Sequence, residues 1–162
     1  YCKNVSDTII DHGVNIEKFT PCREKDNQFA ISSQLISRKH IEKSIEAFAK
    51  YLNKYDDSAK LYIMGDGDEK ENLRKLAKDL GADKNIIFTG KLGHNELIEI
   101  LKKSIAMLVY TEKDNNMVSI VESIALATPV ITTDIPYNAS YIKAEKLGIV
   151  LERGRFKKTC NK

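Results

Sequence analysis

The stretch that decides the fold is Thr111 to Thr133, which reads TEKDNNMVSIVESIALATPVITT. It follows a short apolar run, Met107–Tyr110, and contains a second one, Pro129–Thr132. Both runs are rich in residues that favour β-strands. Between them, apolar residues recur at helical spacing from Met117 to Ala127. The stretch therefore predicts the end of a strand, a polar turn, a helix and a second buried strand.

The predicted helix carries one acidic residue, Glu122, among small and apolar neighbours. We expect Asn115 or Asn116 to cap this helix. The positions expected to face the core are Met117, Ile120, Val121 and Ile124. Glu122 lies more than one turn inside the helix, too far to cap it, and no structural partner is predicted for its side chain. A second acid, Asp114, lies eight positions earlier in the turn.

Two interpretations of Asp114 and Glu122 stay open on this segment alone. A glutamate in a helix is commonly a solvated surface residue, and an acid before a helix commonly caps it or offsets its dipole. Alternatively, the two acids flank the positive N-terminus of the helix, where a phosphate can bind. The second interpretation predicts a site for an anion and for hydroxyl groups.

The rest of the chain alternates apolar runs with amphipathic helical segments. The predicted strands are Phe29–Ser33, Leu61–Met64, Ile86–Phe88, Met107–Tyr110, Pro129–Thr132 and Gly148–Leu151. Strands joined by helices predict right-handed βαβ units and a parallel sheet. The fold class is therefore α/β: an open, doubly wound, mostly parallel sheet of about six strands, covered on both faces.

The helices between these strands have recognisable apolar faces. We expect the following residues to be buried: Ile41, Ile45, Phe48, Ala49 and Leu52; then Leu73, Leu76, Ala77 and Leu80; then Leu97, Ile98, Ile100 and Leu101. Gly81 is the expected stop of the second helix, and a last helix is expected at Tyr137–Lys146.

Composition is that of an ordinary globular domain, with 42% hydrophobic and 30% charged residues in 162. The net charge of +3 is too small to indicate a nucleic-acid partner. The three cysteines, Cys2, Cys22 and Cys160, have no paired spacing and predict reduced thiols. The three histidines, His12, His40 and His94, are scattered and form no metal-ligand cluster. Reduced thiols indicate a cytoplasmic protein, either free or at the inner face of the membrane. No apolar run in the sequence is long enough to span a membrane, and no signal peptide is recognised.

Polar segments follow four of the predicted strands: Ser32–Lys39, Gly65-Asp66-Gly67, Thr89-Gly90-Lys91 and Asp114–Met117. In open parallel sheets, ligands bind beyond the carboxyl ends of the strands. The glycine pair is not a dinucleotide fingerprint, because the third glycine is missing, and alone it indicates only a tight turn. Before the first strand, His12 beside Gly13 is either part of a turn or a site group.

The order of these features resembles a known family. Lys39 follows a polar turn, then come IMGDGDE at 63–69, IIFTG at 86–90, the pair Asp114 and Glu122, and ATPVITT at 127–133. This order resembles the C-terminal, donor-binding half of the retaining GT-B glycosyltransferases of glycosyltransferase family 4. HGVNIEKFTP at 12–21 resembles the link between that family's two domains. We therefore expect a connector at residues 1–28 and a Rossmann-like nucleotide-sugar-binding domain at residues 29–162.

The resemblance implies a role for each site residue. Lys39 would lie against the diphosphate of a UDP- or GDP-sugar, Asp114 would contact the donor sugar, and Glu122 would accept hydrogen bonds from the ribose. Lys39 and Asp114 are the implied catalytic pair. Further implied donor-binding residues are Gln34, Arg38, Gly65, Lys91, Leu92, Asn116, Met117 and Val118, the last three through backbone N–H groups. The family retains anomeric configuration, and the resemblance implies no metal and no cofactor.

Two positions depart from the family pattern. Asp114 stands where the family usually has Glu, and Gln34 where it often has Arg. A cation lost at about 4 Å from a phosphate forfeits up to about 4 kcal/mol at an effective dielectric near 20. Arg38 is the candidate to compensate. The alternatives are a non-catalytic sugar-nucleotide-binding or regulatory module of the same fold, and another α/β enzyme such as an epimerase or phosphorylase.

The same resemblance implies a second domain in the full protein. The acceptor would bind to an N-terminal domain, and closure of the two domains would exclude water from the reaction. We therefore expect residues 1–162 alone to bind a nucleotide sugar and to transfer nothing. A peripheral association of the full protein with the membrane is compatible with this expectation.

Overall fold

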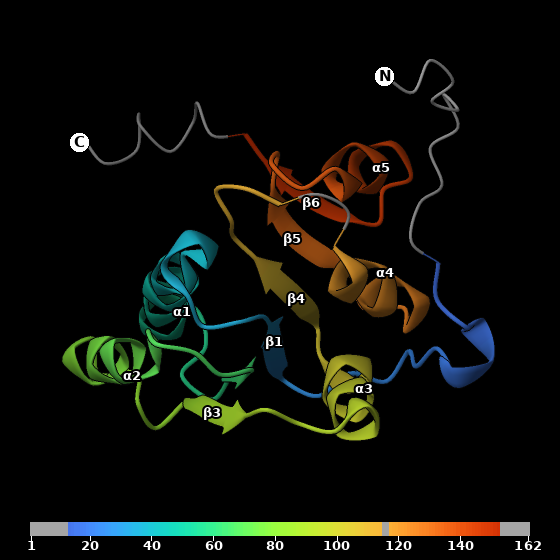
Figure 1. Ribbon diagram of the computed structural model, residues 1–162. Helices are drawn as coiled ribbons and strands as arrows, with labels where there is room; N and C mark the ends of the chain where they lie inside the picture. The colour runs from blue at the N-terminus through green and yellow to red at the C-terminus, as the bar shows by residue number, and fades with distance from the viewer. Residues whose placement is uncertain (1–12, 115–116, 153–162) are drawn as a thin grey trace, which may run out of the picture.

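A six-stranded sheet forms the centre of the computed structural model, which describes residues 13–114 and 117–152 (Figure 1). The strands are β1 (Gln28–Ser32), β2 (Lys60–Met64), β3 (Ile86–Gly90), β4 (Ala106–Val109), β5 (Val130–Thr133) and β6 (Gly148–Leu151). All neighbouring strands pair in parallel, in the order β3-β2-β1-β4-β5-β6. The predicted α/β class and all six predicted strands are confirmed, with ends shifted by at most two residues.

Helices connect the consecutive strands. They are α1 (Ile41–Lys54), α2 (Lys70–Asp79), α3 (His94–Lys103), α4 (Val118–Ala125) and α5 (Asn138–Ala144), with 3-10 turns η1 (Ile16–Lys18) and η2 (Ser37–Lys39). Side chains of α1 and α2 pack on one face of the sheet, and side chains of α3, α4 and α5 pack on the other. Figure 1 shows α1 and α2 on one side of the strands and α3 and α4 on the opposite side. The sheet is therefore doubly wound, as predicted.

The face of the sheet under α1 and α2 buries the predicted stripes with one exception. All five residues predicted for α1 are buried, as are Leu73 and Ala77 of α2, and Leu76 is partly buried. Leu80 is 38% exposed, so its predicted burial is wrong. The reason is that α2 ends at Asp79, and Gly81 with φ of 69° turns the chain away. Gly81 is thus the stop that the sequence predicted.

On the opposite face, α3 follows the prediction more closely than α4 does. Ile98 and Leu101 are buried, and Leu97 and Ile100 are partly buried. In α4 the buried residues are Ile120 and Ser123, and Ile124 is partly buried against the same core. Val121 is only half-buried and belongs to neither core cluster, so the predicted stripe was wrong at this position. Ser123 is tolerated inside because its hydroxyl donates to the carbonyl of Thr128 at 3.0 Å. The N-cap of α4 is Met117, and Asn115 and Asn116 lie outside the described residues.

The segment before β1 packs along the domain. Phe19 is buried in the core formed by α3, α4 and the sheet. The Cys22 amide donates to the carbonyl of Leu126, and the Asp26 amide to the carbonyl of Lys103. Residues 13–27, called the connector segment below, are therefore fixed to the ends of α3 and α4. His12, Cys2 and Cys160 lie outside the described residues.

Candidate functional site

The strand order reverses between β1 and β4, and this is where an open sheet offers a crevice. The connection from β1 passes to one face and that from β4 to the other, so their carboxyl ends diverge. A small cavity lies at this point, lined by residues that follow both strands: Ser32, Ser33, Lys39, Val109, Tyr110 and Met117 among others. Lys39 and Met117, two of the residues named from the sequence, therefore lie at the topological switch point.

Lys39 and Asp114, the implied catalytic pair, are in direct contact. The Nζ of Lys39 lies 2.5 Å from Oδ2 of Asp114, and the two side chains are only 11% and 16% exposed. The hydroxyl of Thr111 donates to the same carboxylate oxygen at 2.8 Å. Because a charge-assisted hydrogen bond with little solvent around it is strong, the pair fixes the loop after β4 to the turn η2.

Backbone contacts strengthen the junction between these two loops. The Glu112 amide donates to the carbonyl of Arg38 at 3.1 Å, and the Arg38 guanidinium donates to the carbonyl of Lys113 at 3.1 Å. The guanidinium of Arg38 is therefore bound to the loop that carries Asp114. In this arrangement Arg38 holds the loop. Its contacts do not support the expectation that Arg38 compensates for the cation absent at Gln34.

His40 forms a contact that the sequence analysis missed. Its backbone has a left-handed conformation, with φ of 42°, and its ring lies between two carboxylates. Nδ1 is 2.7 Å from Oε1 of Glu42, and Nε2 is 2.8 Å from Oε1 of Glu112. Burial lowers the pKa of His40, but the hydrogen bonds to Glu42 and Glu112 outweigh it, so the pKa is raised above its usual 6.5.

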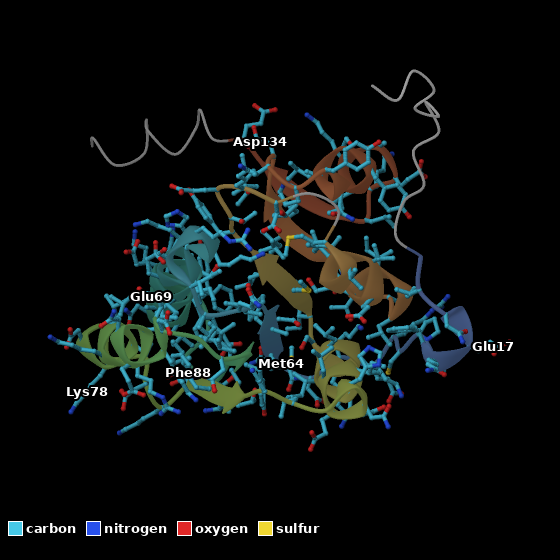
Figure 2. The ribbon with its side chains drawn as sticks, in the orientation of Figure 1. Glu17, Met64, Glu69, Lys78, Phe88 and Asp134 are labelled. Carbon is cyan, nitrogen blue, oxygen red and sulfur yellow. The ribbon has the colours of Figure 1, made fainter. Side chains whose placement is uncertain are left out.

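A larger, open cavity of about 320 Å³ adjoins the first and shares Ser32 and Ser33 with it. Its lining contains four residues named from the sequence: Gln34, Gly65, Lys91 and Leu92. Met64 at the end of β2 also lines it, and Figure 2 shows this side chain in the interior, between α2 and α3 in this view. The predicted donor-binding residues are thus divided between two neighbouring cavities, and Glu122 lines neither of them.

Gly65 and Gly67 allow the loops after β1 and β2 to touch. A Cβ atom on Gly65 would lie 1.8 Å from the carbonyl oxygen of Ser33, and one on Gly67 would lie 2.4 Å from that of Leu35. Both glycines have positive φ, 143° and 158°. The glycine pair, which alone indicated only a tight turn, is therefore required for close approach of two backbones that border the larger cavity.

Glu122 has a partner, contrary to the expectation that it has none. Its Oε1 lies 2.8 Å from Nε2 of His94, the first residue of α3. The Glu122 side chain is 14% exposed and the His94 side chain 51%. Neither a motif nor the spacing pointed to His94, because the two residues come from different helices.

The N-terminus of α4 is partly occupied by the protein itself. The Met117 amide donates to Oδ1 of the buried Asn138 at 2.6 Å, so in this structure that N–H is not directed at a ligand. Asn116 lies outside the described residues, and the Val118 side chain is exposed. The Met117 amide, one of the three backbone groups implied to bind phosphate or sugar, therefore already has an acceptor within the protein.

Among residues 13–114 and 117–152, no three His, Cys, Asp or Glu side chains gather where they could hold a metal ion. No helix there has the length and apolar character needed to cross a membrane.

Comparison with known proteins places these features in a family. Residues 15–159 match the family described as "Glycosyl transferases group 1". The chain belongs to this family. It is 30% identical over 116 residues, or 72% of its length, to N-acetyl-alpha-D-glucosaminyl L-malate synthase from Bacillus anthracis. It spans 29% of that relative, and about a third of the length of the curated relatives that it matches.

Solved structures share the fold. The C-terminal domain of a glycosyl transferase group 1 family protein from Francisella tularensis superposes with a TM-score of 0.76 at 22% identity, over 86% of this chain and 80% of that one. The pneumococcal O-GlcNAc transferase GtfA, solved with UDP and GlcNAc, gives a TM-score of 0.72 at 21% identity, over 83% of this chain and 26% of that one. The fold is that of one half of a GT-B glycosyltransferase, as the sequence resemblance implied.

Proposed function

We propose that this chain is the donor-binding domain of a retaining glycosyltransferase and that it binds a nucleoside-diphosphate sugar at the carboxyl edge of its sheet. The observation that carries the proposal is the contact between Lys39 and Asp114 at the switch point, with Glu122 eight residues further along. One cation for a diphosphate and two acids for hydroxyl groups match the chemistry of such a donor. Membership of the glycosyl transferase family supports it.

In the proposed complex, Lys39 binds the diphosphate. A lysine about 4 Å from a phosphate oxygen contributes up to about 4 kcal/mol of Coulomb attraction at an effective dielectric near 20. Because Lys39 is already paired with Asp114, donor binding divides its charge between the carboxylate and the phosphates. Asp114 is then free to accept hydrogen bonds from hydroxyls of the donor sugar.

The base and ribose are proposed to occupy the larger cavity and its rim. Lys91 and Leu92 line that cavity and would edge the base, and Gly65 lines it as well. Glu122 would accept hydrogen bonds from the ribose hydroxyls, since an ionised carboxylate has only acceptor sites. The solved relative that holds UDP and GlcNAc makes UDP the first nucleotide to try.

The proposed reaction is glycosyl transfer with retention. The bond between the anomeric carbon and the diphosphate oxygen breaks, and its electron pair leaves with the nucleoside diphosphate. The acceptor oxygen bonds to the anomeric carbon on the same face, and its proton passes to the departing phosphate. The positive charge of Lys39 stabilises the negative charge that develops on the leaving group.

The acceptor site is proposed to lie in a further domain of the full protein. The chain covers about a third of its curated relatives, so most of each relative has no counterpart in these residues. Excluding water around a donor requires a second surface above the open cavity. We therefore propose that the 162 residues bind donor and that transfer needs the full protein.

Calorimetric titration with UDP, GDP and their sugars tests the proposal. The wild-type chain should bind either UDP and its sugars or GDP and its sugars. The Lys39→Ala substitution should weaken binding of that nucleoside diphosphate by about 1.5–3 kcal/mol, the range for a hydrogen bond to a charged group. Lys78→Ala is the matched control, because Lys78 carries the same charge on the exposed outer end of α2, away from both cavities (Figure 2). Equal affinities for the two variants would contradict the proposal.

A further inference from the structure

We propose that His94 is a positioning residue for Glu122: it holds one carboxylate oxygen so that the other is presented to the ribose hydroxyls. This inference rests on the proposed donor-binding function, and it adds a residue that neither the sequence motifs nor the implied site contained. His94 would act on the nucleotide only through Glu122.

The contact joins two helices, α3 and α4, that are separate in sequence. Nε2 of His94 and Oε1 of Glu122 are 2.8 Å apart and 28 residues apart in sequence. An ionised carboxylate only accepts, so the imidazole donates, either as the cation or as the neutral tautomer with hydrogen on Nε2. The pairing uses Oε1 and leaves the second oxygen of Glu122 outside this hydrogen bond.

The position of His94 is itself fixed, which a positioning residue requires. Its backbone begins α3, and the preceding residue, Gly93, donates its amide to the side chain of Glu96 at 2.9 Å. Its ring and that of Phe19 are T-shaped, with centroids 6.0 Å apart and planes at 77°. Phe19 is 6% exposed and belongs to the connector segment, which is anchored to Leu126 after α4. The imidazole is therefore supported by contact with a buried aromatic ring.

The location of His94 suits an action on the nucleotide. Leu92 lines the larger cavity two residues before it, and Leu97 lines the cavity three residues after it. His94 thus begins α3 beside the cavity and contacts Glu122 of α4. The imidazole is half-exposed, while the carboxylate is largely covered.

A held carboxylate binds better than a free one for an entropic reason. A glutamate side chain that rotates freely must be ordered when a ligand binds, and each ordered long side chain costs a part of the affinity. If His94 orders Glu122 before the nucleotide arrives, this cost is removed. We expect loss of the histidine to weaken nucleotide binding about 3- to 10-fold.

The test compares His94→Phe and His94→Gln in calorimetric titrations of the full chain. Phe keeps the ring contact with Phe19 and removes the donor, whereas the amide of Gln can place a donor near the position of Nε2. The ligands are UDP, or GDP if the wild type prefers it, and the matching 2′,3′-dideoxynucleoside diphosphate, which lacks the hydroxyls that Glu122 would bind. Thermal unfolding confirms that each variant folds, and His94→Ala replaces the Phe variant if that one does not.

The proposal predicts a pattern that a merely structural role would not produce. His94→Phe should weaken UDP binding about 3- to 10-fold and leave dideoxynucleotide binding unchanged. His94→Gln should restore most of the affinity for UDP. In a Glu122→Ala background the histidine substitution should have no further effect on affinity.

Several results would overturn the proposal. Equal weakening for both ligands, or an additive effect in the Glu122→Ala background, would show that His94 supports the fold and does not position Glu122. Unchanged UDP binding in His94→Phe, beside weakened binding in Glu122→Ala, would refute the role of His94 while the proposed function stands. Failure of the wild-type chain to bind either nucleotide, or full affinity in Glu122→Ala, would overturn the proposed function and this inference with it.

Discussion

The two acids of the proposed site are held in different ways. Asp114 belongs to a region built from loops: it is bound by Lys39 and Thr111, and its loop is joined to the turn after β1 by further backbone contacts. Glu122 belongs to a region built from helices, where His94 is the hydrogen-bond partner described for its carboxylate. We call the region around Lys39, Thr111 and Asp114 the loop half of the site, and the region around His94 and Glu122 the helix half. Several hydrogen bonds hold the loop half together, whereas the helix half is kept rigid by α3 and α4.

This difference predicts where substitutions act. In the loop half, the groups that would bind the donor also hold the loops together, so changes there should affect both stability and binding. In the helix half, core packing supplies the stability, and the polar pair can be changed with little effect on it.

The largest effect on stability is expected for Gly65→Ala in the loop half. The new Cβ would lie 1.8 Å from the carbonyl oxygen of Ser33, and φ of 143° is unfavourable for alanine. Overpacking of this kind costs about 1–3 kcal/mol and backbone strain adds a similar amount, so we expect a loss of about 3 kcal/mol or more.

Urea denaturation measures this loss, and Gly13→Ala is the control, because nothing lies within 4 Å of a Cβ at Gly13. If Gly65→Ala and Gly13→Ala unfold at the same urea concentration, the two loops are not in the close contact described.

A smaller loss is expected when the Lys39–Asp114 pair is broken. Asp114→Ala leaves the ammonium of Lys39, only 11% exposed, without its carboxylate, which should cost about 1–3 kcal/mol of unfolding free energy. Glu122→Ala should cost less than about 1 kcal/mol, since its partner His94 is half-exposed and can be solvated. Denaturation of both variants under the same conditions compares the halves, and equal losses would remove the distinction between them.

The smallest effect is a pH dependence in the loop half. The pKa of folded His40 is raised above the usual 6.5, so its contribution to stability is fully present below about pH 6.5 and is lost as the pH rises through the folded pKa. His40→Asn removes the titration and tolerates the left-handed backbone. The stability difference between wild type and this variant, up to about 1 kcal/mol, should shrink between about pH 6 and 8.

Denaturation at a series of pH values checks this prediction. The Glu112→Gln variant, which lacks one of the two carboxylates beside His40, should show a weaker dependence on pH. A stability difference that grows as the pH rises would show that the sign assigned to His40 is wrong.

The parts of the molecule that the sequence predicted are those with local signals. Each strand is a short apolar run and each long helix has a regular stripe, so the sheet and its class followed from pattern alone. Where local pattern and tertiary contacts compete, the prediction failed. Val121 is only half-buried whereas Ser123 is buried, because a hydroxyl can be buried when a nearby carbonyl accepts its hydrogen bond.

The structure brings together several of the residues named from the sequence, and the sequence missed most of the contacts that hold them. Lys39 and Asp114 follow different strands, and the sheet brings them together as expected for parallel strand ends. The contacts of His40 with Glu112 and of His94 with Glu122 depend on how helices and loops are placed in space, and no spacing rule reports that. The position of Arg38 against the loop has the same origin.

The central claim is that Glu122 is part of a nucleotide-binding site, and calorimetric titration of UDP and GDP into Glu122→Ala tests it most directly. Because the carboxylate would form charged hydrogen bonds with the ribose hydroxyls, we expect affinity to fall by about 1.5–3 kcal/mol while the thermal unfolding midpoint stays close to that of the wild type. Unchanged affinity in a folded variant would contradict the account.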